Sequence, residues 1–182
     1  MKHNIRIGLL TLILPLLIGK SFAQSQSEPN HERPVPLCSS EDKPYRDFDF
    51  VVGEWEMFDK DGKKVGEQSY VKREQGCLIT EEWTTTTGGT GHGMTFVDPS
   101  TGLWRQVYVS PLGQIDYSGG IDENGSMVLE GTIHPTDGKP SAPIRGIWTK
   151  QDDGSIEEEF LILNSKTNTW FTFYYGIARK KK

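Results

Sequence analysis

The sequence predicts an all-β protein, an up-and-down antiparallel barrel of about ten strands. Short segments in which apolar and polar residues alternate recur roughly 8–14 residues apart. Gly, Pro, Asn and Asp mark the turns between them, and no window keeps a helical period for more than about two turns. Because nearly all connections are short, strands that are neighbours in sequence should pair. Closure into a barrel then removes the exposed edges of the sheet.

The first 23 residues have the order of a signal peptide. Lys2 and Arg6 give a basic start, and residues 7–18 form an apolar run too short to cross a membrane. Residues 21–23, Ser-Phe-Ala, match the small-x-small pattern of a cleavage site. We therefore expect cleavage after residue 23 and an exported protein, periplasmic or secreted. An uncleaved anchor is the alternative.

The remaining chain divides into a flexible lead-in at 24–45, rich in Ser and Pro, and one barrel domain at 46–182. Removal of the signal leaves 17 of the 20 basic residues against 25 acids, a formal charge of −8. Such an acidic protein is a poor partner for nucleic acid or anionic membranes. No membrane span is expected in it, and no pattern indicates its oligomeric state.

The first expected strand covers 46–58. Phe48, Phe50 and Val52 alternate with polar residues, which is the period of a strand with one buried face. Gly53 interrupts the alternation, and a glycine at such a place usually marks a bend at a barrel corner. The other strands are expected at 65–73, 77–86, 92–98, 103–110, 114–119, 126–133, 142–150, 155–163 and 169–178.

The turns between these strands have recognisable signals. Residues 98–102, Asp-Pro-Ser-Thr-Gly, form a strong turn signal, and 122–125 end in the Asn-Gly pair that hairpins favour. The glycine-rich stretch at 88–91 resembles a phosphate-binding loop only in composition. It joins two expected strands and opens no helix, so we interpret it as a flexible hairpin.

The chain has two cysteines, Cys38 and Cys77. In an exported protein an even count favours a disulfide. This bridge would close a loop of roughly 38 residues and, in the chain-entropy model, stabilise the fold by about 4 kcal/mol. A zinc site is the alternative, but it needs further ligands at close spacing, and none lie nearby in the sequence. No metal is expected.

Three motifs resemble those of a family of uncharacterised exported bacterial proteins with calycin- or lipocalin-like barrels. The family carries FDFW-x-G-x-W, GC-x-x-x-E-x-W and YDP-x-TG-x-WRQ, which stand here at 48–55, 76–83 and 97–106. Val51 and Val97 replace the family's Trp and Tyr. The resemblance covers nearly the whole barrel domain and implies a lipocalin-like barrel. It implies no particular ligand, because one fold serves many functions.

The related nitrobindin-like barrels use a histidine near the chain end as an axial haem ligand. No histidine follows His134 here, and the last expected strand carries Trp170, Tyr174 and Tyr175 instead. We therefore expect no haem and no other cofactor.

One face of several expected strands mixes aromatic side chains with isolated polar groups. Such a lining suits a cavity in which apolar walls give affinity and a few polar groups fix orientation. We therefore predict that the interior binds a small apolar or amphipathic molecule. The residues predicted to contact it are Trp83, Trp104, Arg105, Gln106, Tyr108, Arg145, Trp148 and Trp170. The alternative is that the aromatic residues simply fill the barrel.

Two residues are candidates for proton transfer. Glu81, if it faces inward beside Trp83, would have a raised pKa and could act as a general acid or base in a cyclase, isomerase or hydratase. His92, at an expected barrel mouth, is the second candidate. For Glu81 the alternative is an ion pair with Arg105 or Arg145.

Motifs for other chemistry are missing. The sequence has no G-x-S-x-G nucleophile elbow and no H-E-x-x-H metal motif, and Cys77 should be oxidised rather than nucleophilic. Residues 157–159, three consecutive glutamates, are interpreted as a partly solvated charge run in the ninth strand. A third hypothesis is an accessory protein that docks a partner, which would show an exposed apolar patch and no cavity.

Overall fold

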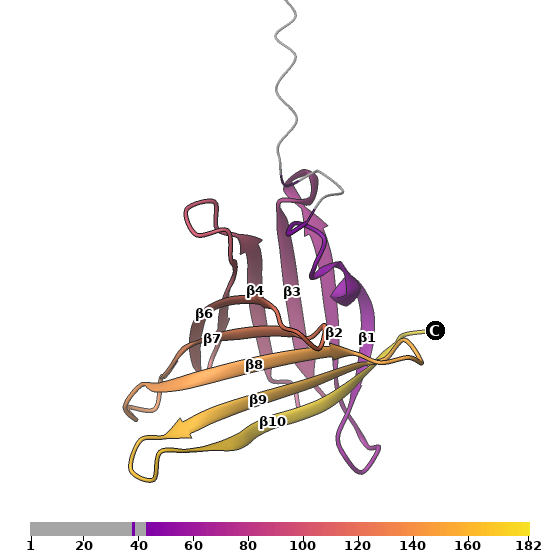
Figure 1. Cartoon of the computed structure of the whole chain (residues 1–182). Helices are drawn as coiled ribbons and strands as arrows, with labels where there is room; N and C mark the ends of the chain where they lie inside the picture. The colour runs from indigo at the N-terminus through magenta and orange to yellow at the C-terminus, as the bar shows by residue number, and fades with distance from the viewer. Residues whose placement is uncertain (1–37, 39–42) are drawn as a thin grey trace, which may run out of the picture. The chain divides into compact units, whose positions relative to one another are not determined.

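The structure, a computed structural model, describes Cys38 and residues 43–182. The predicted signal peptide at 1–23 and most of the predicted lead-in at 24–45 lie outside the described residues. Over the described part of the chain, ten strands close into an antiparallel barrel in which sequence neighbours pair and β1 meets β10 (Figure 1). The prediction of an up-and-down barrel is confirmed.

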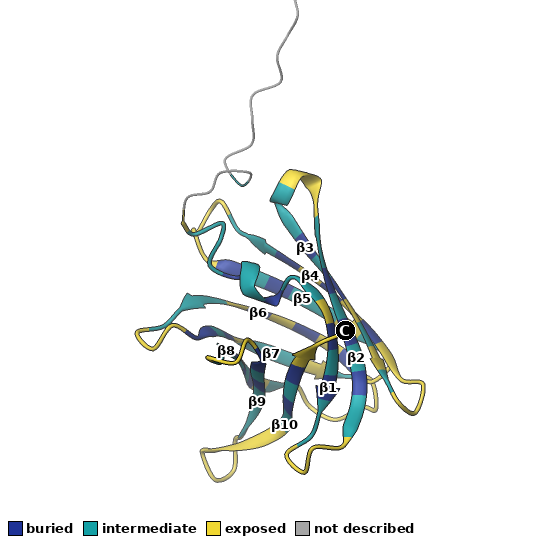
Figure 2. Cartoon of the chain, turned by 90° about the vertical axis from the view of Figure 1, so that its right-hand side faces the viewer, coloured by how far each residue is buried: buried dark blue, intermediate teal, exposed yellow. Residues whose placement is uncertain are grey.

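The strand bounds agree with the predicted ones to within a few residues, apart from the first. The strands are β1 (Gly53–Phe58), β2 (Lys64–Arg73), β3 (Leu78–Thr85), β4 (Thr90–Val97), β5 (Trp104–Ser110), β6 (Gly113–Ile121), β7 (Met127–Pro135), β8 (Ala142–Lys150), β9 (Ile156–Asn164) and β10 (Thr169–Lys180). Along them, buried residues alternate with more exposed ones, and the hairpin loops are mostly exposed (Figure 2). No helix among the described residues is long and apolar enough to cross a membrane.

The first strand begins later than predicted. β1 starts at Gly53, whereas Asp49–Val51 form a 3₁₀ turn, η2. Gly53 has a φ of +141°, a backbone conformation that residues with a Cβ atom rarely adopt. This conformation lets the chain turn from η2 into the barrel wall. The indole N–H of Trp55 donates to the carbonyl of Val51 at 2.6 Å and holds the turn against the strand. The alternation before Gly53 therefore belongs to a turn with one buried side and not to a strand.

The turn η2 closes one end of the barrel, which we call the closed end. Phe48 is fully buried there, and its ring lies 5.8 Å from that of Trp104 and 5.2 Å from that of Trp148, edge to face in both pairs. Trp104 also donates to the carbonyl of Pro44 at 3.2 Å. Burying an aromatic side chain of this size stabilises the fold by about 1.5–3 kcal/mol, so the closed end is a packed core.

A disulfide joins Cys38 to Cys77, as predicted, with Cα atoms 4.8 Å apart. It ties the segment before η2 to the short turn η3 (Glu74–Gly76) and the start of β3. A guanidinium N–H of Arg46 donates to the carbonyl of Cys38 at 3.2 Å and holds Cys38 against the residues just before η2. The segment that leads into η2 is therefore held at the closed end by a covalent bond as well as by packing.

Candidate functional site

The barrel is hollow at the end opposite η2, which we call the open end. The cavity has a volume of about 960 Å³. It is bordered by the loops that join β1 to β2, β5 to β6 and β7 to β8, which an up-and-down barrel places at the same end. Its walls include the apolar side chains of Trp83, Ile115, Ile133, Phe160, Ile162 and Phe173. The interior is therefore not filled by its aromatic residues.

On three strands, the inward-facing side chains follow the same order from the closed end to the open end. The first is apolar, the second polar and the third aromatic. The sets are Ile79, Glu81 and Trp83 on β3, Trp104, Gln106 and Tyr108 on β5, and Ile156, Glu158 and Phe160 on β9. Since side chains alternate along a strand, the polar members form one layer at mid-height. This layer, the floor cluster, comprises Gln68, Tyr70, Glu81, Gln106, Tyr117 and Glu158.

Glu81 lies at the centre of a hydrogen-bond network in the floor cluster. Its two carboxyl oxygens each accept one amide N–H, from Gln68 and from Gln106, both at 2.9 Å. The Gln68 amide also donates to the hydroxyl of Tyr70 at 2.8 Å, and the hydroxyl of Tyr117 donates to the carbonyl of Gln106. These neutral partners orient the Glu81 carboxyl group but do not neutralise its charge.

Burial raises the pKa of Glu81 to about 7, although the hydrogen bonds from Gln68 and Gln106 act in the opposite direction. The side chain is only 6 % exposed. Gly93 on the neighbouring strand makes this position available, because a Cβ there would lie 2.7 Å from Glu81 Oε2. Glu81 therefore faces inward, which was the condition for its hypothetical role in proton transfer, whereas Arg105 and Arg145, its alternative partners, pair with Asp116 and Glu130.

Glu158 is the second acid of the floor cluster, and we interpreted it from sequence as part of a solvated charge run. It is 1 % exposed, because it alternates in phase with Ile156 and Phe160 on the inner face of β9. Burial, followed by the charge of Glu81, raises the pKa of Glu158 well above its usual range. Its Oε1 atom is buried without a hydrogen-bond partner. The two-residue period was the signal that could have identified this acid.

Three of the predicted contact residues lie outside the barrel, which corrects the expected lining. Arg105 donates to both carboxyl oxygens of Asp116, at 2.9 and 2.7 Å. Arg145 pairs with Glu130 at 2.6 Å, and its guanidinium carbon lies 4.7 Å from the ring centre of Trp170. Both arginines are out of phase with the inward residues of their strands, so they form pairs across the outer surface.

Trp170 faces outward because of an irregularity in β10. The pairing with β9 shifts by one residue between Thr172 and Tyr174. Phe171 before the shift, Phe173 at the shift and Tyr174 after it all line the cavity. A bulge of this kind inverts the simple alternation from which the inward position of Trp170 was predicted.

The other predicted residues divide between the cavity and its surroundings. Trp83 and Tyr108 line the cavity, and Gln106 belongs to the floor cluster beneath it. Trp104 and Trp148 are buried in the closed end and do not border the cavity. His92 is exposed on the outer face of β4, so it cannot exchange a proton with a molecule inside the barrel.

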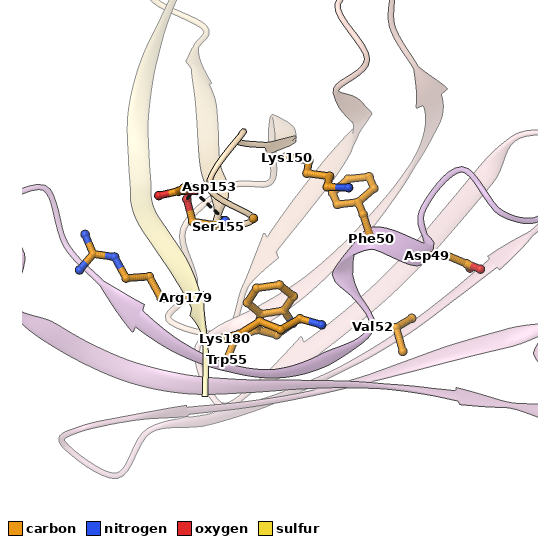
Figure 3. Close-up of a pocket in the computed structure, with 10 residues that line it drawn as sticks. Asp49, Phe50, Val52, Trp55, Lys150, Asp153, Ser155, Arg179 and Lys180 are labelled. Atoms are coloured by element: carbon orange, nitrogen blue, oxygen red, sulfur yellow. Dashed lines mark hydrogen bonds between the residues drawn. The ribbon is translucent and has the colours of Figure 1, made fainter. Parts of the chain in front are cut away.

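A second, smaller hollow of about 580 Å³ lies at the closed end (Figure 3). Lys150, Arg179 and Lys180 line it together with Asp153 and Trp55. The amino group of Lys180 lies 5.3 Å from the ring centre of Trp55. This hollow therefore combines cationic and acidic groups, whereas the barrel cavity is walled by apolar residues.

Within residues 43–182 and Cys38, no three His, Cys, Asp or Glu side chains form a group that could hold a metal ion. No protein-family model matches the chain, and no curated protein is similar to it in sequence. The arrangement in the cavity is therefore the main guide to function. It offers apolar walls and a floor of carboxyl, amide and hydroxyl groups.

Proposed function

We propose that the protein binds a small apolar or amphipathic molecule inside the barrel. The observation that carries the proposal is the cavity of about 960 Å³ with aromatic and aliphatic walls above a hydrogen-bonding floor. Pockets of this size and composition bury most of the surface of a small molecule, and their few polar groups fix its orientation. Phe171 and Phe173 are 49 % and 54 % exposed although they border the cavity. These two rings offer an apolar path from the rim to the interior.

Native mass spectrometry after gentle purification tests this proposal first, followed by tryptophan quenching with a panel of lipids and metabolites. We expect a bound small molecule and quenching that is lost in Trp83→Phe, because Trp83 lines the cavity. Trp170→Phe is the matched control and should leave quenching unchanged, since Trp170 lies on the outer surface. A protein that takes up no member of the panel, or equal quenching in both variants, would contradict interior binding.

We also propose an enzymatic alternative, favoured by one observation. The pKa of Glu81 is raised to about 7, which suits a general acid or base near neutral pH. The reaction would be a cyclisation, isomerisation or hydration of the bound molecule. Incubating the co-purified molecule with the protein in D₂O should then give deuterium incorporation or a new product, and Glu81→Gln should abolish it. If the molecule is recovered unchanged from both the parent protein and Glu81→Gln, the enzymatic alternative is excluded and the proposal of a binding protein stands.

We further propose that the protein is exported and related to the exported lipocalin-like family that its motifs resemble. The Cys38–Cys77 disulfide supports this, because disulfides persist in oxidising compartments. Mass spectrometry of the protein from the periplasm or medium should give an N-terminus at Gln24. An intact Met1 would contradict cleavage of the signal.

A further inference from the structure

We propose that the interior ligand is an amphipathic molecule whose deep end is a hydrogen-bond donor, an ammonium or a hydroxyl group, and that the cavity rejects carboxylates and phosphates. This inference rests on the proposed binding function and specifies its ligand class.

The charged groups of the cavity are mostly acidic. Glu81 and Glu158 belong to the floor, and Asp59 and Asp137 border the rim. Among the described residues, Lys139 is the one basic side chain that borders the cavity. It lies in the loop after β7, is 76 % exposed and pairs with Asp137 at 2.5 Å. An anionic head group at the floor would therefore meet two acids and no cation.

The floor also has buried polar atoms without partners. Glu158 Oε1, Gln68 Oε1 and the hydroxyl of Tyr174 make no hydrogen bond, and all three residues line the cavity. The amide oxygen of Gln68 can only accept, as can an ionised Glu158 carboxylate. Buried polar atoms of this kind are normally paired in folded proteins. A ligand N–H or O–H would pair with the oxygens of Gln68 and of an ionised Glu158, whereas a carboxylate would add further acceptors beside them.

An ammonium group is favoured over a hydroxyl group when the floor is ionised. The polar residues that surround Glu81 in the barrel interior include no cation. They are Gln68 and Tyr70 on β2, Thr95 on β4, Gln106 and Tyr108 on β5, Tyr117 on β6, Glu158 on β9 and Tyr174 on β10. A bound cation would stabilise the ionised forms of both acids. Affinity for an alkylammonium should therefore rise with pH through the pKa of Glu81, about 7.

Three probes with the same alkyl chain test the inference: dodecylamine, dodecanol and dodecanoate. Binding is measured at pH 7.5 by quenching of Trp83 fluorescence, below the concentration at which each probe forms micelles. We expect dodecylamine to bind tightest and dodecanoate at least about tenfold more weakly than dodecanol. If dodecanol instead binds as tightly as dodecylamine, the donor is a hydroxyl group, and the proposal stands in that form.

Two isosteric variants locate the head group. Glu158→Gln removes a carboxyl group of the floor and should weaken dodecylamine binding at least about tenfold. The affinity for dodecanol should stay within about threefold of that of the parent protein. Glu130→Gln removes an exposed acid on the outer surface and should change neither. Circular dichroism of both variants checks that the barrel is folded. If Glu158→Gln is folded and binds dodecylamine as the parent does, the head group is not at the floor and the proposal fails.

The remaining outcomes separate the two proposals. Dodecanoate binding equal to or tighter than that of dodecylamine overturns the ligand class but leaves interior binding intact. Failure of all three probes to quench Trp83 or to appear in native mass spectra overturns interior binding of amphipathic molecules, and this inference falls with it.

Discussion

Two glutamates on neighbouring strands, Glu67 and Glu81, have opposite environments. Glu67 faces outward and pairs with Lys181 at 2.6 Å and Lys64 at 2.7 Å, and these hydrogen bonds lower its pKa to about 2. Glu81 faces inward, accepts hydrogen bonds from the neutral amides of Gln68 and Gln106, and has a pKa that burial raises to about 7. The pKa of a glutamate in this barrel therefore depends on the face of the sheet that the residue occupies.

The difference extends to other acids of the barrel. On the outer surface, Asp116 and Glu130 each pair with an arginine, and such exposed pairs contribute little to stability. Inside, Glu81 and Glu158 have no basic partner, and burial of an unneutralised acid is costly. Packing alone would be better served by apolar residues at these positions. The burial of these two acids therefore supports the proposal that a bound molecule pairs with them.

The largest expected effect is on the pH dependence of stability. Between pH 4.5 and about 7, unfolded Glu81 loses its proton while folded Glu81 retains it, so the free energy of unfolding should fall as pH rises, by about 3 kcal/mol. Glu158 should add to this fall over the same range and extend it to higher pH, because its pKa is also raised. Urea unfolding at several pH values measures this slope.

The comparison is sharpened by matched substitutions. Glu81→Gln should remove the contribution of Glu81 to the slope between pH 4.5 and 7, so that only the contribution of Glu158 remains. Glu67→Gln should leave the slope unchanged, because Glu67 is ionised in both the folded and the unfolded state through most of this range. Equal slopes in the parent and in Glu81→Gln would mean that Glu81 is not a buried, unneutralised acid.

The second effect concerns the space that Glu81 occupies. Gly93→Ala would place a Cβ 2.7 Å from Glu81 Oε2 and 3.1 Å from the amide nitrogen of Gln106. We expect a loss of about 1–3 kcal/mol in the free energy of unfolding, which is typical of overpacking. Gly120→Ala is the control, since no atom lies within 4 Å of a Cβ there. Similar losses in both variants would show that the floor cluster is not tightly positioned.

The smallest effect is expected on the outer surface. Asp116→Asn breaks the pair with Arg105, whose side chains are 46 % and 40 % exposed. The free energy of unfolding should fall by at most about 1 kcal/mol, and the difference should shrink in 1 M salt because solvent ions screen exposed pairs. A larger loss that persists in salt would mean that the outer pairs are structural.

The sequence predicted the barrel from turn residues and a two-residue period, and the disulfide from an even number of cysteines. The same period placed Glu81 on one face with Ile79 and Trp83 but left open whether its carboxyl group was buried or paired with an arginine. The sequence did not predict that η2 is a turn, since Phe48 alternates as a strand residue would but packs against Trp104 and Trp148, far away in the chain. The bulge in β10 likewise depends on pairing with β9. Arg105 and Arg145 were assigned to the cavity for their chemistry, although their alternation indicated the outer face.

Glu81 and Glu158 lie inside the barrel without a basic partner, and we propose that a ligand supplies the cation. Carbon-13 NMR of the glutamate carboxyl groups, with and without dodecylamine, tests it most directly. Without the probe, we predict that Glu81 titrates near pH 7 and Glu158 above its usual range, and that dodecylamine lowers both pKa values. Titration of both groups near the ordinary glutamate value of about 4.3 in the empty protein would contradict the account.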